Sequence, residues 1–244
     1  MVTDMAAQRL DKLISGQRII SRADAKKLIT GGHIMVNGVL CRIPDTKVDP
    51  DTEEITADGE PLCYKKHLYL MLNKPAGVVS AARDARVKTV LDLVPEPLRR
   101  KGLFPAGRLD KDTVGFVLIT DDGDFAHRLL SPGRHVPKTY HALLSELPDE
   151  PALERLREGI ELADGSVCRP ARVSILSASP PVAELVITEG MYHQVKRMFA
   201  AAGNRVLQLK RVKIGALWLD DSLPEGMCKE ILNKDVEKLL VRDL

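Results

Sequence analysis

Aromatic residues are scarce in this chain: four phenylalanines, four tyrosines and one tryptophan make up 4% of its 244 residues. Apolar runs are short as well, since residues 68–72 and 116–119, among the longest, fall far below the roughly 18 residues that a membrane helix needs. The first twelve residues, MVTDMAAQRLDK, include acids and contain no apolar stretch typical of a secretory signal. These absences predict a cytoplasmic protein with no membrane contact.

Cysteine is also rare, and its placement predicts no cross-links. The four cysteines, Cys41, Cys63, Cys168 and Cys228, form no C-x-x-C pair and have no histidine at ligand spacing. We therefore expect neither a zinc site nor a disulfide framework, and interpret them as small buried residues. The chain also lacks a G-x-G-x-x-G or P-loop pattern, so no metal and no organic cofactor are predicted.

A large surplus of one charge is missing too, since the formal net charge is only +2. The basic residues are nevertheless concentrated in two zones. Residues 9–47 hold eight basic residues against three acids, and residues 196–213 hold six against none. Two basic zones on a nearly neutral chain indicate either a polyanion bound at two places or two solvated faces.

The first 60 residues have the pattern of a compact module. Apolar residues recur at helical spacing twice, and Ser21 stands where a helix N-cap is expected. Asn37-Gly38 then predicts the turn of a β-hairpin. We expect a domain over residues 1–60, a linker over 61–66 and a larger domain over 67–244.

After the linker, strand and helix patterns alternate. Hydrophobic content of 44% and charged content of 29% are ordinary for a protein with a packed core. The pattern predicts an α+β or mixed α/β domain. Strands are expected at 68–72, 115–120, 140–144, 172–175, 183–188 and 206–212, and helices at 125–130, 152–158 and 193–202.

The stretch GRLDKDTVGFVLITDDG, residues 107–123, carries the clearest candidate for chemistry. It places Arg108 and Asp110 in a glycine-flanked loop before a buried strand, from which a carboxylate can face a cleft. Asp110, Asp112, Asp121 and Asp122 are alternatively metal ligands or turn residues, and spacing favours turns. Asp121-Asp122-Gly123 in particular is interpreted as a turn.

Four separated motifs together resemble the ribosomal small subunit pseudouridine synthase A (RsuA) family. They are NKPAG at 73–77, RLDKDTVGFVLITDDG at 108–123, KTY at 138–140 and EGMYHQVKRMF at 189–199. The front module, with RLDKLIS and SRADAKKLITGGHIMVNG, resembles an S4 RNA-binding domain. The resemblance implies an α+β chain: a small N-terminal S4 (α-L) domain, then a pseudouridine synthase domain with a mixed, largely antiparallel sheet, flanking helices and a central cleft.

The resemblance also assigns roles to three residues. The family's catalytic aspartate falls on Asp110, the tyrosine that stacks on the target base falls on Tyr140, and the basic partner of the aspartate falls on Lys196. Without the motif, Tyr140 in a strand would favour a core position and Lys196 a surface charge. Lysine offers a point charge and not a bidentate fork, so its pairing with Asp110 should be looser than arginine's.

Further contacts with RNA are expected from both domains. Arg108 and Lys74 are assigned to the cleft, and Arg197 to the RNA backbone or solvent. His193 and Gln194 are expected to support the site, either at the Asp110 loop or within their own helix. In the front module, the RNA-binding candidates are Arg9, Arg22 and Lys26.

The implied activity is isomerisation of a specific uridine in small-subunit (16S) ribosomal RNA to pseudouridine. The expected enzyme is a monomer, and its expected partner is ribosomal RNA in an assembling small-subunit particle. Two alternatives stay open: a synthase of the same superfamily for large-subunit RNA, and a non-catalytic RNA-binding assembly factor. The tyrosine–histidine pair of GMYHQVKRMF resembles the small-subunit group. The intact set of Asp110, Tyr140 and Lys196 argues against a pure binder.

Overall fold

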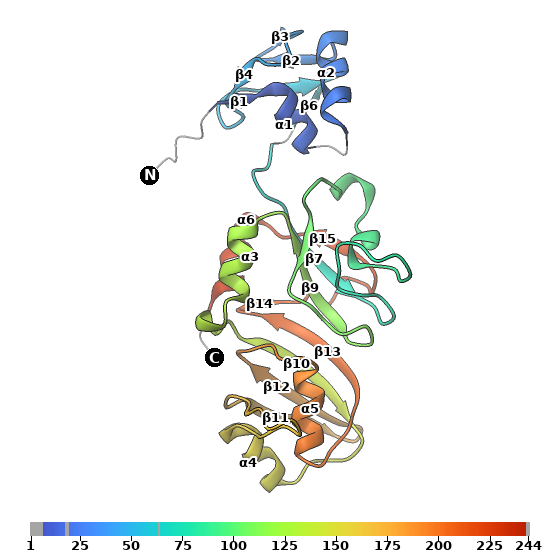
Figure 1. Ribbon diagram of the computed structural model, residues 1–244, viewed down its shortest axis with the longest axis vertical. Coiled ribbons are helices and arrows are strands. Elements are labelled where there is room, and N and C mark those ends of the chain that lie inside the picture. Colours follow the sequence, from blue (N-terminus) through green and yellow to red (C-terminus); the bar gives the residue numbers. More distant parts are fainter. Residues whose placement is uncertain (1–6, 18–19, 63, 243–244) are drawn as a thin grey trace. The chain divides into compact units, whose positions relative to one another are not determined.

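The computed structural model describes residues 7–17, 20–62 and 64–242 (Figure 1). Contacts divide the chain into two units. The first contains the chain up to His67 together with Glu96–Leu103, and the second contains Leu68–Pro95 and Phe104–Leu244. The segment Glu96–Leu103 therefore belongs to the first unit although it lies far along the sequence, as hydrogen bonds from Arg100 to the Lys65 and Lys66 carbonyls show.

The first unit packs two helices against short strands. Helix α1 (Leu10–Gln17) and α2 (Arg22–Gly31) bury their apolar residues in one core. Ser21 caps α2 as predicted, since its side chain accepts a hydrogen bond from the Asp24 amide at 3.0 Å. The sheet has the order β3-β2-β5-β6, with β1 and β4 paired separately. Its strands are β1 (Gln8–Arg9), β2 (Ile34–Val36), β3 (Val39–Leu40), β4 (Lys47–Val48), β5 (Ile55–Ala57) and β6 (Glu60–Pro61).

The predicted hairpin is present between β2 and β3. Asn37 and Gly38 have φ values of 52° and 75°, so both central residues of the turn are left-handed. Asparagine and glycine tolerate this conformation better than other residues, which explains why this dipeptide joins the strands.

The second unit is built on a nine-stranded mixed sheet. Strand order is β11-β12-β10-β13-β9-β7-β15, with β14 added to β13 and β8 to β9. All pairs are antiparallel except β9 with β13, so the expected largely antiparallel sheet is confirmed. The strands are β7 (Tyr69–Lys74), β8 (Phe104–Ala106), β9 (Val114–Thr120), β10 (Lys138–Leu144), β11 (Arg172–Ala178), β12 (Pro181–Ile187), β13 (Val206–Ile214), β14 (Leu217–Trp218) and β15 (Cys228–Glu230).

The parallel pairing of β9 with β13 joins two halves of this sheet through only two residue pairs, which we call the seam: Val114 with Lys210, and Gly115 with Arg211. Gly115 has a φ of +100°, and a Cβ atom there would lie 2.3 Å from the Arg211 carbonyl oxygen. Only glycine fits so close an approach of two backbones.

Helices flank each half of the sheet. Figure 1 shows α3 and α6 near the β7–β9 part and α4 and α5 near the β10–β12 part. Asp122 caps α3 through the Phe125 amide, so part of the predicted turn is the start of a helix. None of the described helices reaches the length and apolarity that crossing a membrane requires. The helices are α3 (Gly123–Leu130), α4 (Glu150–Glu158), α5 (Gln194–Ala201) and α6 (Asn233–Val236), with 3-10 turns η1 (Val90–Leu93), η2 (Glu96–Leu98), η3 (Pro132–Arg134) and η4 (Glu237–Leu240).

Candidate active site

The loop that carries Asp110 lies between β8 and β9 and is held by the segment after β7. The Ser80 hydroxyl accepts from the Leu109 amide and donates to the Leu109 carbonyl, at 3.0 Å in each case. The Gly77 amide donates to the Lys111 carbonyl at 2.8 Å. The backbone is therefore fixed on both sides of Asp110. Nothing in the spacing of the sequence indicated Ser80.

Lys74 holds the same loop from the end of β7. Its side chain is 0% exposed, and its ammonium donates to the carbonyls of Pro75, Lys111 and Thr113 at 3.1, 3.2 and 2.7 Å. This corrects the expectation that Lys74 contacts RNA in the cleft, because a fully enclosed ammonium has no surface to offer a phosphate. Its role in the structure is to fix the loop.

The charge of Lys74 is shaped by its surroundings. Burial lowers the pKa of Lys74 to about 8, and the nearby carboxylates of Asp112 and Asp110 act in the opposite direction. At neutral pH the side chain therefore stays protonated and keeps all three donors.

The Asp110 carboxylate lies among cationic and polar groups of α5 and its N-cap. Lys196 Nζ is 3.4 Å from Asp110 Oδ2 and 2.5 Å from Asp112 Oδ1, so one ammonium serves two carboxylates. His193 Nε2 is 3.4 Å from Asp110 Oδ1. The hydrogen bond from Lys196 holds the pKa of Asp112 below its usual range. Asp110 keeps about a quarter of its side chain exposed, as a group that meets a substrate must.

Tyr140 lies on a row of directly paired residues that crosses the sheet: Lys74, Gly115, Arg211, Tyr140 and Leu185. Neighbours in such a row share one face of the sheet. The row therefore links the lysine that fixes the Asp110 loop with Tyr140, across the seam. The Tyr140 side chain is buried, with 7% of the residue exposed, so it presents little open ring surface in this structure.

Arg211, the residue between Gly115 and Tyr140 in this row, is itself buried at 4% exposure. Its Nε donates to the Phe116 carbonyl at 2.7 Å. Burial, with the Arg211 charge adding to it, lowers the pKa of Lys138 to about 8. The sequence marked Arg211 only as part of a basic zone, because its burial depends on strand pairing that spacing does not reveal.

Arg108 and Arg197, two further predicted RNA contacts, differ in their exposure and in their partners. Arg108 is exposed beside the Asp110 loop. Arg197 keeps 27% of its side chain exposed; its Nη2 lies 2.6 Å from Asp164 Oδ2 and its Nη1 donates to the Tyr192 carbonyl at 3.3 Å. The contact of Arg197 with RNA or solvent stays a prediction, and in this structure the side chain pairs with an exposed acid of the same unit.

The first unit contains the other three candidates. Arg9 and Arg22 each make two hydrogen bonds of 3.1 Å to Asp11, which is 0% exposed, and Arg9 also lies 3.8 Å from Asp45. Much of the charge expected to attract RNA is thus neutralised within the unit. Lys26 is exposed and forms no ion pair with any residue that the structure describes.

Metal-ligating side chains do not gather in the described part of the chain, where no group of three or more His, Cys, Asp or Glu could hold an ion. Asp110 and Asp112 face the Lys196 ammonium. Asp121 and Asp122 accept backbone amide hydrogen bonds. In this structure, two of the four acids considered as ligands therefore lie beside an ammonium and two accept backbone hydrogen bonds.

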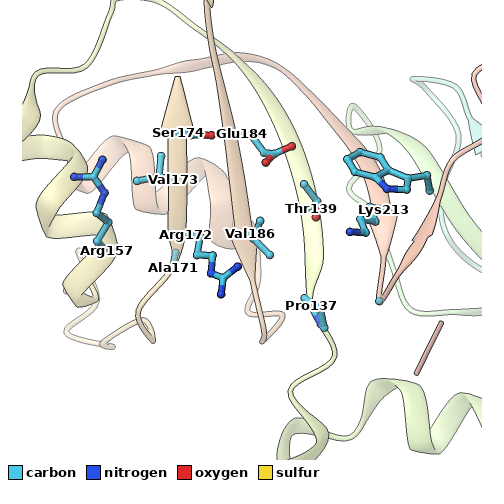
Figure 2. Close-up of a pocket in the computed structure, with 12 residues that line it drawn as sticks. Pro137, Thr139, Arg157, Ala171, Arg172, Val173, Ser174, Glu184, Val186 and Lys213 are labelled. Atoms are coloured by element: carbon cyan, nitrogen blue, oxygen red, sulfur yellow. The ribbon is translucent and has the colours of Figure 1, made fainter. Parts of the chain in front are cut away.

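A pocket of about 600 Å³ in the second unit lies away from this site (Figure 2). Thr139, Lys213 and Trp218 line it, and they are paired in one row of the sheet. Because Thr139 and Tyr140 are consecutive in β10, their side chains point to opposite faces. The pocket therefore belongs to the face opposite Tyr140, and the Asp110 group is the site we consider further.

Two family models match the chain. The first, for RNA pseudouridylate synthase, covers residues 68–201, and the second, for the S4 domain, covers residues 8–53. The chain belongs to the RNA pseudouridine synthase family. The synthase has the Asp110 loop, Tyr140 and Lys196 within the matched part, and its two family models correspond to the two units of the fold.

Several relatives resemble the synthase over nearly its whole length. An uncharacterised RNA pseudouridine synthase of Bacillus subtilis is 44% identical over 95% of this chain and 98% of its own. Ribosomal small subunit pseudouridine synthase A of Escherichia coli is 39% identical over 95% of this chain and 100% of its own. A crystal structure of a pseudouridylate synthase matches with 38% identity and a TM-score of 0.66, over 96% of this chain and 100% of that chain.

Proposed function

We propose that this synthase isomerises one uridine of small-subunit ribosomal RNA to pseudouridine, with Asp110 as its catalytic residue. The observation that carries the proposal is the Asp110 carboxylate, fixed by its loop and flanked by Lys196 and His193 at 3.4 Å. Relatives named ribosomal small subunit pseudouridine synthase A support the RNA class. The tyrosine–histidine pair at 192–193 favours the same class over large-subunit RNA.

The reaction explains why a carboxylate in this setting is useful. The bond between C1′ and N1 of the uridine breaks, the uracil turns, C5 bonds to C1′, the proton on C5 leaves, and N1 takes up a proton. A carboxylate can act as a nucleophile that departs again or as a base for this proton. Lys196 Nζ lies 3.4 Å from Asp110 Oδ2, where its positive charge offsets the negative charge of the carboxylate.

Tyr140 is proposed as the aromatic residue at the target base. A base removed from its RNA stack loses its neighbours, and contact with an aromatic ring returns part of that energy, about 1–3 kcal/mol. Because the residue is 7% exposed, we infer that the base meets an edge of the ring or that nearby side chains move when RNA binds. Arg108, exposed beside Asp110, is proposed to contact the RNA around the target.

The S4 unit is proposed as a second RNA contact, and an assembling small-subunit particle as the setting in which a monomer of this synthase acts. Of the three candidates in this unit, Lys26 has the most available charge, because Arg9 and Arg22 share Asp11. A non-catalytic assembly factor is less well supported, since binding alone gives no reason for a carboxylate held between a lysine and a histidine.

The test combines mapping with a single substitution. Pseudouridines in total ribosomal RNA are mapped in cells with and without the gene, and release of tritium from C5-labelled uridine is measured with the purified protein. One small-subunit position should depend on the gene. Asp110→Asn should lower the rate by at least about a thousandfold while RNA affinity changes little, because size is kept and only the nucleophile or base is lost. Activity of the variant within about tenfold of wild type would exclude Asp110.

A further inference from the structure

Tyr192 precedes His193, the neighbour of Asp110, and is an aromatic residue with a large exposed surface: 76% of it is exposed. In a chain with only nine aromatic residues, such exposure beside a catalytic carboxylate calls for an explanation. Its ring stacks on the His193 ring, with centroids 3.9 Å apart and an angle of 16° between the planes. His193 in turn lies 3.4 Å from Asp110. The two rings form a continuous path from the carboxylate to solvent.

The position of this ring pair is set by several contacts of the segment before α5. Gln194, buried at 4% exposure, accepts from the Met191 amide at 2.9 Å and donates to Glu189 at 2.5 Å. Arg197 donates to the Tyr192 carbonyl at 3.3 Å. These contacts fix the backbone that carries Tyr192, and the stack on His193 is the contact of the ring itself.

The backbone of His193 carries a further sign of a fixed arrangement. Its φ is 49°, in the left-handed region that residues other than glycine rarely occupy. Such a conformation persists only where the surroundings determine it, and it is common at binding sites. In this arrangement His193 Nε2 lies 3.4 Å from Asp110 and the ring stacks on Tyr192.

We propose that Tyr192 is a binding subsite for the unpaired base of a nucleotide that flanks the target uridine. One face of the ring is covered by His193, and the exposure of the residue leaves surface on which a base can stack. When the target uridine leaves the RNA stack, the neighbouring base loses a partner, and Tyr192 replaces it. Arg108, which is exposed in the Asp110 loop, supplies positive charge for the RNA backbone near this position.

This inference rests on the proposed function and adds a residue that selects the sequence or structure around the target. A ribosomal protein could instead cover the ring, and that possibility is an outcome of the experiment below. We favour RNA as the partner of the ring because the stacked rings of Tyr192 and His193 lie beside Asp110, where the RNA reaction is proposed to occur.

The experiment uses the full-length protein with two substrates: a short RNA that contains the mapped target uridine, and assembled small-subunit particles that contain the same uridine. Two further RNAs carry an abasic nucleotide on the 5′ or the 3′ side of that uridine. The variants are Tyr192→Ala, which removes the ring, and Tyr192→Phe, which keeps it. Trp218→Ala is a matched control, because Trp218 is an aromatic residue with 51% exposure that lines the pocket on the opposite face.

On the intact RNA, Tyr192→Ala should raise Kd and KM about 5- to 100-fold, the range that loss of one stacked base predicts, with a smaller change in kcat. Tyr192→Phe should restore most of the affinity, and Trp218→Ala should match wild type. On one of the two abasic RNAs, wild type and Tyr192→Ala should bind equally, because the two changes remove the same contact.

Several results would overturn the inference. Equal KM for Tyr192→Ala and wild type on intact RNA would show that the ring does not contact the substrate. A penalty that persists on both abasic RNAs would show that Tyr192 contacts something other than a flanking base. A loss seen only with assembled particles and absent on RNA would indicate a protein partner. An inactive wild-type protein would instead contradict the proposed function itself.

Discussion

The two units each enclose a fully buried charged side chain, and they satisfy it in opposite ways. In the first unit Asp11, 0% exposed, is neutralised by the guanidinium groups of Arg9 and Arg22. In the second unit Lys74, also 0% exposed, is met by three backbone carbonyls. Ion pairs between side chains join two elements of a unit, whereas a lysine that donates to backbone carbonyls fixes the conformation of a loop. The first arrangement should therefore matter for stability and the second for activity.

The largest effect should follow from Lys74→Met, which keeps the length of the side chain and removes its donors. The Asp110 loop loses three hydrogen bonds, and a shift of about 1 Å at a catalytic group can cost about a hundredfold in rate. We expect kcat to fall about a hundredfold with little change in KM, and unfolding to become easier by about 1–3 kcal/mol. Steady-state kinetics and thermal unfolding measure the two effects.

Lys88→Met is the control, since Lys88 is an exposed lysine of the same unit. If both variants kept wild-type kcat, the carbonyl contacts of Lys74 would have no part in placing Asp110.

Asp11→Asn should mainly reduce stability. Removing one member of a buried charge pair costs about 3–5 kcal/mol, but both arginines are about half exposed and recover solvation, so we expect about 2–3 kcal/mol. Hydrogen exchange of α1 and α2 should report the loss. Asp51→Asn, at an exposed acid of the same unit, should leave exchange unchanged; equal effects of the two would refute a special role for Asp11.

The two buried charges should also respond to pH at opposite ends of the scale. Hydrogen bonds from Arg9 and Arg22 hold the pKa of Asp11 below its usual range, so its contribution is complete above about pH 4 and is lost as pH falls. The pKa of Lys74 is lowered from 10.5 to about 8, so the unfolded chain binds more protons between these values and stability from this group rises with pH there.

Denaturant unfolding measured from about pH 2 to about pH 10.5 covers the pH ranges in which Asp11 and Lys74 affect stability. The acid-side slope should shrink in Asp11→Asn, and the alkaline slope should shrink in Lys74→Met. Lys138 has a pKa lowered to about 8 as well and should keep part of the alkaline slope in that variant. Slopes identical to wild type in both variants would contradict these assignments.

The smallest expected effect concerns RNA affinity of the first unit. Lys26→Ala should lower the slope of log K against log salt by about one, as the loss of one phosphate contact predicts. Arg22→Ala should change this slope less and stability more, since Arg22 is paired with Asp11. Filter binding over a salt series compares the two. A larger slope change for Arg22→Ala would show that its pairing with Asp11 yields to RNA.

The sequence predicts elements and motifs better than it predicts contacts of buried charges. The resemblance placed Lys196 beside Asp110, and the two side chains lie 3.4 Å apart. The contacts of Lys74 could not be predicted. Its three acceptors are backbone carbonyls, which every residue has, so nothing in the sequence marks the three that the fold brings within reach. The same holds for Ser80, whose partner Leu109 is 29 residues away.

Charge patterns gave the wrong emphasis in the first unit for a related reason. Arg22 and Lys26 share a helix face, which indicated a basic surface. Asp11 lies in a different helix, and only the packing of α1 against α2 brings it to Arg22. A pattern along one helix cannot show which charges are already paired across an interface.

The seam between β9 and β13 separates residues of the candidate site. Asp110 precedes β9 on one half of the sheet, whereas Tyr140 and the α5 residue Lys196 belong to the other half. The backbone pairing of β9 with β13 consists of two residue pairs, and a methyl group added at Gly115 would clash with the backbone of Arg211. A residue other than glycine at position 115 would therefore force β9 away from β13, the strand that pairs with Tyr140.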